Sequence, residues 1–235
     1  MGDNPMLAKK QTKQKASMKE RLNTLRAGVL GSNDGILTVV GVLFSVAAAT
    51  TNQFTIFIAG LSDLLACAFS MACGEYASVS TQRDTEEAAV RKEQHLLDTD
   101  FDGQVKAVQE YYMARGVTAN TSLAIANDLL SKKPLETVVN VKDGIKVGQY
   151  MNPWSAAFSS LFSASAGGVF PLAAMTFAPV AYQWPATILA VILSVGLTGY
   201  LSAKLGDGLV KTAVIRNIVI GIITMLIHYG VGRLM

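Results

Sequence analysis

The segment from Gly60 to Glu93, GLSDLLACAFSMACGEYASVSTQRDTEEAAVRKE, decides how the chain is organised. It is apolar at its start and charged at its end, with no Pro or loop-like run between, so one helix is predicted to begin in a membrane and end in water. Residues four apart share a helix face. One face holds only small residues: Ser62, Ala66, Ser70, Gly74 and Ser78. The neighbouring face holds four potential metal ligands: Asp63, Cys67, Met71 and Glu75.

The composition is that of a membrane protein. Of the 235 residues, 51% are hydrophobic and 16% charged, and the mean hydropathy is +0.35, which is too apolar for an ordinary soluble domain. We therefore predict an all-α integral membrane protein with five transmembrane helices and a small helical cytoplasmic domain between the second and third. The seven Lys and Arg residues before Ala27 indicate membrane orientation rather than nucleic-acid binding.

Five apolar segments are long enough to cross a bilayer, which takes roughly 20 residues at about 1.5 Å each. Their predicted bounds are 25–50, 54–80, 153–177, 186–205 and 212–234. The predicted organisation is a basic cytoplasmic tail at 1–24, spans one and two at 25–82, a cytoplasmic helical domain at 83–147 and spans three to five at 148–235. Lys and Arg fall in alternate connections, so the positive-inside rule predicts a cytoplasmic N-terminus and a C-terminus on the opposite side.

The predicted cytoplasmic domain is polar, with eleven Asp and Glu against nine Lys and Arg in 83–147. Apolar periodicity predicts helices at about 84–97, 102–115 and 119–131, and Pro134 is expected to break the pattern. A connection of this length inside a compact chain needs secondary structure of its own. We therefore expect these helices to pack together as a small domain.

Three carboxylates lie within predicted spans: Asp34 in the first, and Asp63 and Glu75 in the second. Each charge at the bilayer centre costs on the order of 2.5–3.5 kcal/mol, and such residues mark pathways or binding sites. Carboxylate oxygens with the Met71 thioether, and Cys67 as a further donor, suit a first-row divalent ion such as Fe²⁺ or Mn²⁺ better than Mg²⁺ or Ca²⁺. As alternatives, Met71 and Cys67 pack as buried apolar residues, and Asp63 and Glu75 lie at helix ends near the interface.

Acidic residues in the soluble domain form a second candidate site. Glu86 and Glu93 are two helical turns apart on one face, and Glu110 could approach them from the next helix. The alternative is a solvated, salt-bridged face, because Arg83 and Arg91 are interleaved with these acids.

The two histidines are expected to be peripheral. His95 is expected to be exposed, and His228 and Arg233 are expected at the far membrane interface, where long side chains reach the headgroups.

Five runs occur in an order that resembles the vacuolar iron transporter (VIT) family over about 25–235. They are SNDGILT, SMACGEYASVSTQRDTEEA, YMARG, MNPWSAAFSS and RNIVIG. The resemblance implies a five-span homodimer with a three-helix cytoplasmic metal-binding domain. It implies export of Fe²⁺ from the cytosol, with Mn²⁺ in some members, proton exchange and an ion path between the subunits.

The resemblance also implies roles for individual residues. Asp34 and Met71 match the pathway Asp and Met, and Asp63 and Glu75 match further acidic positions. The implied metal ligands of the cytoplasmic domain are Glu86, Glu87, Glu93 and Glu110, with Asp143 where a further Glu is expected. The chain departs from the family at Gln94, Gln104 and Gln109, and at Val139-Asn140 where a Met pair is expected, which predicts weaker metal capture or fewer ions.

These observations favour a transporter over an enzyme. His95 and His228 are far apart in sequence, and no nucleophile–base arrangement is recognisable. The alternative is a membrane-anchored metal sensor or binder that does not transport. We expect no prosthetic group, because Fe²⁺ or Mn²⁺ is the cargo; the other expected partners are protons, the lipid bilayer and a second copy of the chain.

Overall fold

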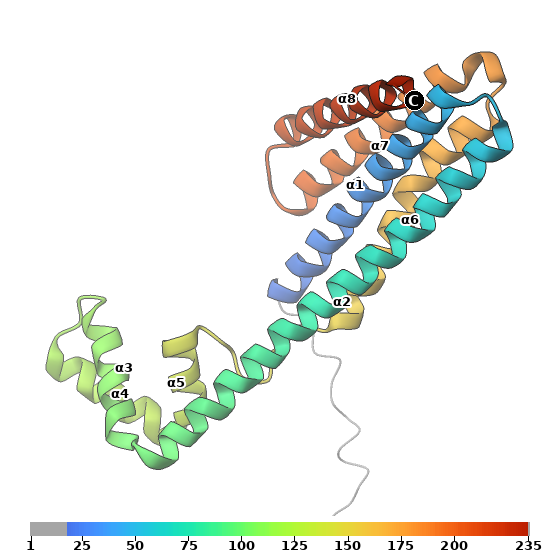
Figure 1. Cartoon of the computed structure of the whole chain (residues 1–235). Coiled ribbons are helices and arrows are strands. Elements are labelled where there is room, and N and C mark those ends of the chain that lie inside the picture. Colours follow the sequence, from blue (N-terminus) through green and yellow to red (C-terminus); the bar gives the residue numbers. More distant parts are fainter. Residues whose placement is uncertain (1–17, 235) are drawn as a thin grey trace, which may run out of the picture. The chain divides into compact units, whose positions relative to one another are not determined.

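The computed structural model describes residues 18–234, which are helical with no strand, and the chain divides into two compact units. One unit comprises the residues up to Tyr76 and from Trp154 onward, and the other comprises Ala77–Pro153. The elements in Figure 1 are α1 (Met18–Ala49), α2 (Gln53–Thr99), α3 (Phe101–Met113), α4 (Ala119–Lys132), α5 (Pro134–Asp143), α6 (Pro153–Phe177), η2 (Val180–Tyr182), α7 (Gln183–Leu205) and α8 (Val210–Leu234).

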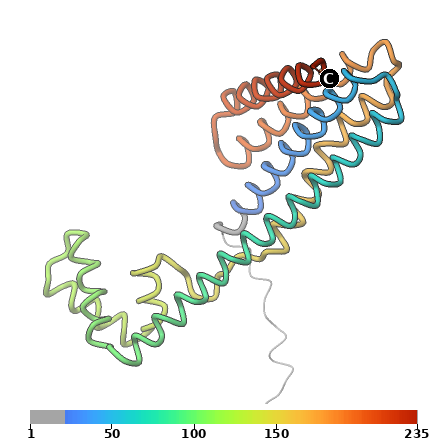
Figure 2. The backbone as a smooth tube through the Cα atoms, viewed as in Figure 1, coloured from blue at the N-terminus to red at the C-terminus, as the bar shows by residue number. Residues whose placement is uncertain are grey.

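Five helices are long and apolar enough to cross a membrane, which confirms the predicted number of spans. The first helix, α1, is longer than the predicted span because it begins at Met18, and the polar run Ser32–Gly35 lies within it. The second, α2, is one helix of 47 residues that continues from the first unit into the second without a break, as Figure 2 shows. The predicted change from an apolar to a charged helix therefore occurs inside one element.

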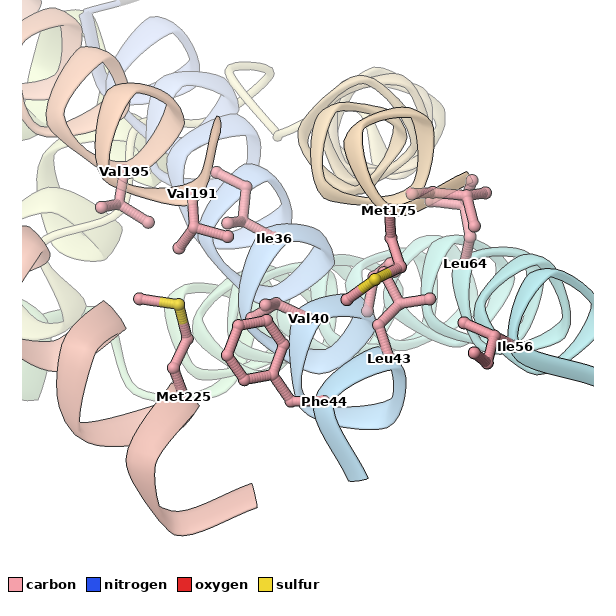
Figure 3. Close-up of a cluster of buried hydrophobic side chains, with 12 residues drawn as sticks. Ile36, Val40, Leu43, Phe44, Ile56, Leu64, Met175, Val191, Val195 and Met225 are labelled. Carbon is pink, nitrogen blue, oxygen red and sulfur yellow. The ribbon is translucent and has the colours of Figure 1, made fainter. Parts of the chain in front are cut away.

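The first unit, which holds α1, α6, α7, α8 and the start of α2, is here called the membrane unit. Helix α1 lies at its centre and packs against α7 and α8. Figure 3 shows its side chains Ile36, Val40 and Leu43 in a buried cluster with residues of α2, α6, α7 and α8. Small residues permit the close crossing of α1 and α6, since a Cβ at Gly35 would stand 2.1 Å from the Ala164 carbonyl oxygen. Such close contact between small residues is how helices associate in a bilayer, where apolar burial alone provides little attraction between them.

The second unit contains the end of α2 together with α3, α4 and α5, around a core of Leu97, Val108, Ala126, Leu130 and Val138. Helices at 101–113 and 119–132 confirm two of the predicted periodic segments. Helix α5 was missed, because Pro134 was expected only to break the pattern. Pro at the first helical position starts a helix without losing a hydrogen bond, and the buried Val138 and Val139 hold α5 against the core.

Candidate functional site

The predicted pathway residue Asp34 lies opposite Cys67 in the membrane unit. The Cys67 thiol donates a hydrogen bond to Asp34 Oδ2 over 3.5 Å, and Cys67 is buried. Thr38, one turn along α1, donates to the Asp34 backbone carbonyl over 3.0 Å. Cys67 is thus buried, as expected of a packing residue, and it also contacts a carboxylate. The Asp34 oxygen and the Cys67 sulfur therefore lie side by side as two potential metal ligands.

Asp63 lies one helical turn beyond Cys67 on α2, at the level of Thr38. The Thr38 side chain, whose hydroxyl donates to the Asp34 carbonyl, lies near the Asp63 carboxylate. One oxygen, Asp63 Oδ2, is inaccessible to solvent and has no hydrogen-bond partner among the described residues. An unsatisfied buried carboxylate oxygen is costly, and it is free to accept a cation or a proton.

Glu75, on α2, lies opposite the start of α1, away from Asp63, and is only 7% exposed. Its Oε2 is 3.5 Å from Nη2 of Arg26, whose side chain is 59% exposed. Arg26 was counted only as an orientation charge in the sequence, because no local spacing connects residues 49 positions apart. The structure makes it the counter-charge of a predicted pathway residue.

Met71 lies between the levels of Glu75 and Cys67 on α2. It is partly buried and packs on the cluster of Cys67, Ala68 and Ala164. This packing agrees with the alternative that Met71 is a buried apolar residue. It also places the thioether between Glu75 and Cys67 along α2.

These contacts define one line, here called the polar track: Glu75, Met71, Asp34, Cys67, Thr38 and Asp63. Arg26 faces Glu75 and Asp34 faces Cys67, so eight residues forward along α1 correspond to eight residues back along α2, as in an antiparallel helix pair. At about 1.5 Å per residue, Glu75 and Asp63 are about 18 Å apart along the axis. They are therefore separate levels.

The His228 side chain is directed toward α1. Its ring packs against Gly41 and Ser45 in α1, and Gly41 is about 12 Å from the end of that helix at Ala49. The sequence predicted His228 at the far interface, and the structure adds that its ring turns inward where α8 packs against a glycine.

In the second unit, the most deeply buried predicted ligand is paired with a lysine. Glu93 is 2% exposed, and Lys142 Nζ donates to its Oε2 over 2.5 Å. The same ammonium donates to Gln104 Oε1 over 3.1 Å. The Lys142 ammonium thus lies between two side-chain oxygens that accept its hydrogen bonds, one from α2 and one from α3.

The other predicted ligands of this unit are dispersed. Glu86 is buried and accepts a hydrogen bond from Gln82 over 3.1 Å. Glu87 accepts one from Arg83 over 2.9 Å; this hydrogen bond and the Glu87 charge raise the pKa of Arg83. Glu110 is exposed, 3.9 Å from Lys106.

Asp143, the last residue of α5, is also exposed. Within residues 22–234, no three His, Cys, Asp or Glu side chains converge closely enough to hold a metal ion. A metal site in this unit therefore stays a prediction.

Comparison with known proteins supports a single family. The model of the VIT family matches residues 25–233. A vacuolar iron transporter of Acanthamoeba castellanii is 33% identical, over 89% of this chain and 78% of its own length. Vacuolar iron transporter homolog 1 of Oryza sativa subsp. japonica is 29% identical, over 91% of this chain and 75% of its own length. The chain belongs to the VIT family.

Proposed function

We propose that this protein exports Fe²⁺ from the cytosol across a membrane, accepts Mn²⁺ as well, and moves protons in the opposite direction along the polar track. One observation carries the proposal: in a VIT-family chain, the unpaired Asp63 oxygen lies one turn from the Asp34–Cys67 contact, between two membrane-spanning helices. Both relatives reported above are named for iron transport.

The chemistry of the levels suggests how an ion passes. Glu75, held by Arg26, is the first carboxylate on the predicted cytoplasmic side, and an arriving divalent ion competes with the guanidinium for it. Met71 then offers sulfur, and Asp34 with Cys67 offers oxygen and sulfur. A site that combines sulfur ligands with carboxylate oxygens favours Fe²⁺ and Mn²⁺ over Mg²⁺ and Ca²⁺, which take oxygen ligands.

The charge of the site supports the proposed proton exchange. A carboxylate or thiol must be deprotonated to bind a metal, so metal entry releases protons and metal departure takes them up. A carboxylate oxygen without a partner, such as Asp63 Oδ2, can hold either a proton or the ion, but not both.

A second copy of the chain fits the exposed small-residue face of α2. Ser62, Ala66, Ser70 and Gly74 are all exposed in the single chain, and no atom lies within 4 Å of the position where a Cβ at Gly74 would stand. In membranes such a face permits close approach of another helix. We infer that this face meets its equivalent in a homodimer.

Flux into proteoliposomes tests the transport proposal. Asp34→Asn and Asp63→Asn keep the size of the side chain and remove its charge, so Fe²⁺ flux is expected to fall to the level of empty liposomes. Asp128→Asn is the matched control, because Asp128 is an exposed acid paired with Lys132 in the other unit. Flux in both pathway variants equal to that of the control would refute the pathway. Metal binding by the wild type without any flux would instead favour a sensor.

A further inference from the structure

A hollow in the membrane unit, away from the line of the polar track, is lined by two arginines. It has a volume of about 620 Å³ and lies between the start of α1, the end of α7 and the start of α8. Ligand sites in proteins have volumes of roughly 300–1,000 Å³. Arg26 lines the hollow from α1 and Arg216 lines it from α8, and none of the described residues that line it is acidic. The hollow is therefore suited to an anion.

Arg216 is a charged residue inside a membrane span. It lies six residues after Val210, the first residue of α8, which is about 9 Å along the helix axis. The side chain is exposed, and it makes no hydrogen bond or ion pair with any residue in 22–234. A charge in a span is costly unless it meets a counter-charge or reaches the headgroups. Arg216 therefore favours an anion at the level of the headgroups.

Arg26 has donors to spare for the same anion. Its Nη2 makes both of its side-chain hydrogen bonds, to Asn23 Oδ1 over 3.2 Å and to Glu75 Oε2 over 3.5 Å. A guanidinium also donates from Nη1 and Nε, and the Arg26 side chain is 59% exposed. Arg26 can thus keep its contact with Glu75 while it donates to a second anion in the hollow.

The apolar lining of the hollow indicates what kind of anion it takes. Leu22, Leu30 and Leu209 line it and are exposed. Leucine side chains at the surface of membrane-spanning helices face acyl chains. A free phosphate has no apolar part that could cover these side chains, whereas a phospholipid carries a phosphate and acyl chains in one molecule.

The positive charges near the hollow also favour a lipid. Lys204 and Lys211 flank it in sequence, and Asp207, between them, does not line it. The sequence places this side of the membrane in the cytoplasm, where anionic lipids are enriched. The chain's own segment 1–17 is a poor occupant, because it carries four lysines and one aspartate and would be repelled by the arginines.

We propose that this hollow binds one phospholipid with a net negative headgroup. Its phosphate accepts hydrogen bonds from Arg26 and Arg216, and its acyl chains cover Leu30 and Leu209. Basic pockets between transmembrane helices recognise anionic headgroups in this way. The inference does not depend on the transported ion, so it stands or falls separately from the proposed function.

Native mass spectrometry of the full chain in detergent tests the site. Phosphatidylglycerol is expected to bind about fivefold or more tightly than phosphatidylcholine with the same acyl chains, because choline cancels the charge of the phosphate. Glycerophosphoglycerol, which is the same headgroup without acyl chains, is expected not to displace it at equal concentration. Equal binding of the two lipids overturns the inference, and displacement by the free headgroup overturns it in favour of a soluble phosphate ligand.

Lys211 provides the matched control on the same helix. Arg216→Gln is expected to weaken phosphatidylglycerol binding about five- to tenfold. Lys211→Gln removes the same charge from an exposed position that does not line the hollow, and it is expected to weaken binding less than about threefold. Equal losses in the two variants overturn the inference, because they indicate general attraction to the basic end of the protein.

A measurement on the unmodified chain removes dependence on the folding of the variants. Phenylglyoxal modifies guanidinium groups, and mass spectrometry compares its rate at Arg216 with that at Arg91, an exposed arginine of the other unit. Phosphatidylglycerol is expected to slow modification of Arg216 relative to Arg91, and phosphatidylcholine is expected to leave the ratio unchanged. A ratio that phosphatidylglycerol does not lower overturns the inference. Slow modification of Arg216 already in the lipid-free protein overturns it in favour of another occupant, such as a second copy of the chain.

Discussion

Replacing Lys142 by Met removes the partner of the most deeply buried carboxylate in the second unit. Glu93 is 2% exposed, and the Lys142 side chain is 29% exposed. The substitution keeps most of the apolar length of the side chain and deletes the ammonium. Glu93 and Gln104 Oε1 then lose their shared donor, and a buried carboxylate is left without a counter-charge.

The magnitude follows from this burial. Removing one partner of a buried ion pair costs about 3–5 kcal/mol. Since Lys142 is partly exposed, water can enter the vacated space, and we expect about 2–3 kcal/mol of lost stability in this unit. Because 1.4 kcal/mol is a factor of ten, the population of locally open states should rise by about 30- to 150-fold.

Hydrogen exchange measures this quantity on the intact chain. The slowest amides of α3, α4 and α5 report the opening of the second unit, and amides of α1 and α8 provide an internal reference in the other unit. Protection in the second unit is expected to fall while protection of the reference amides stays constant.

Two further variants distinguish the charge pair from loss of packing. Lys106→Met breaks an exposed pair, Lys106–Glu110, and should change protection by less than about 1 kcal/mol. Glu93→Leu added to Lys142→Met removes the orphaned charge and should restore most of the lost protection. An effect of Lys142→Met no larger than that of Lys106→Met would refute the reasoning.

Three further predictions concern the membrane unit. Cys73 is exposed and lies seven residues, or two turns, from Ala66 on the small-residue face, so oxidation should cross-link two chains through it; Cys73→Ser should abolish the cross-linked band on a non-reducing gel, and Cys67→Ser should leave it. Gly35→Val should separate α1 from α6 and lower the thermal unfolding temperature in detergent, whereas the control Gly74→Ala meets no atom of its own chain and should not. Arg26→Gln frees Glu75 and should lower the KM for Fe²⁺ about two- to fivefold, since an exposed partner contributes about 0.5–1 kcal/mol; an unchanged KM would contradict competition at Glu75.

Much of the fold could be predicted from local patterns. Five apolar runs of sufficient length specify five spans, and the absence of a breaker between Gly60 and Glu93 specifies one helix through the change of environment. Helix α5 was missed because a ten-residue segment after a proline has too little periodicity to identify by itself.

The candidate site was only partly predictable. Asp34, Asp63 and Glu75 were identified because a carboxylate in an apolar span is costly. Their partners were not, because Arg26 is 49 residues from Glu75 and Cys67 is 33 residues from Asp34. Nothing in the spacing of these residues specifies which turns of two helices face each other.

The sequence alone determined the number of spans, the continuous α2 and the carboxylates inside the membrane, because these depend on the solvation of each segment by itself. Only the tertiary structure decided which residues meet: Arg26 with Glu75, Lys142 with Glu93 and His228 with Gly41. The physical reason is that a helix can rotate about its axis and slide along its neighbour without changing its own hydrogen bonds. Close contacts at small residues fix that rotation and register, and with them the order of the polar track.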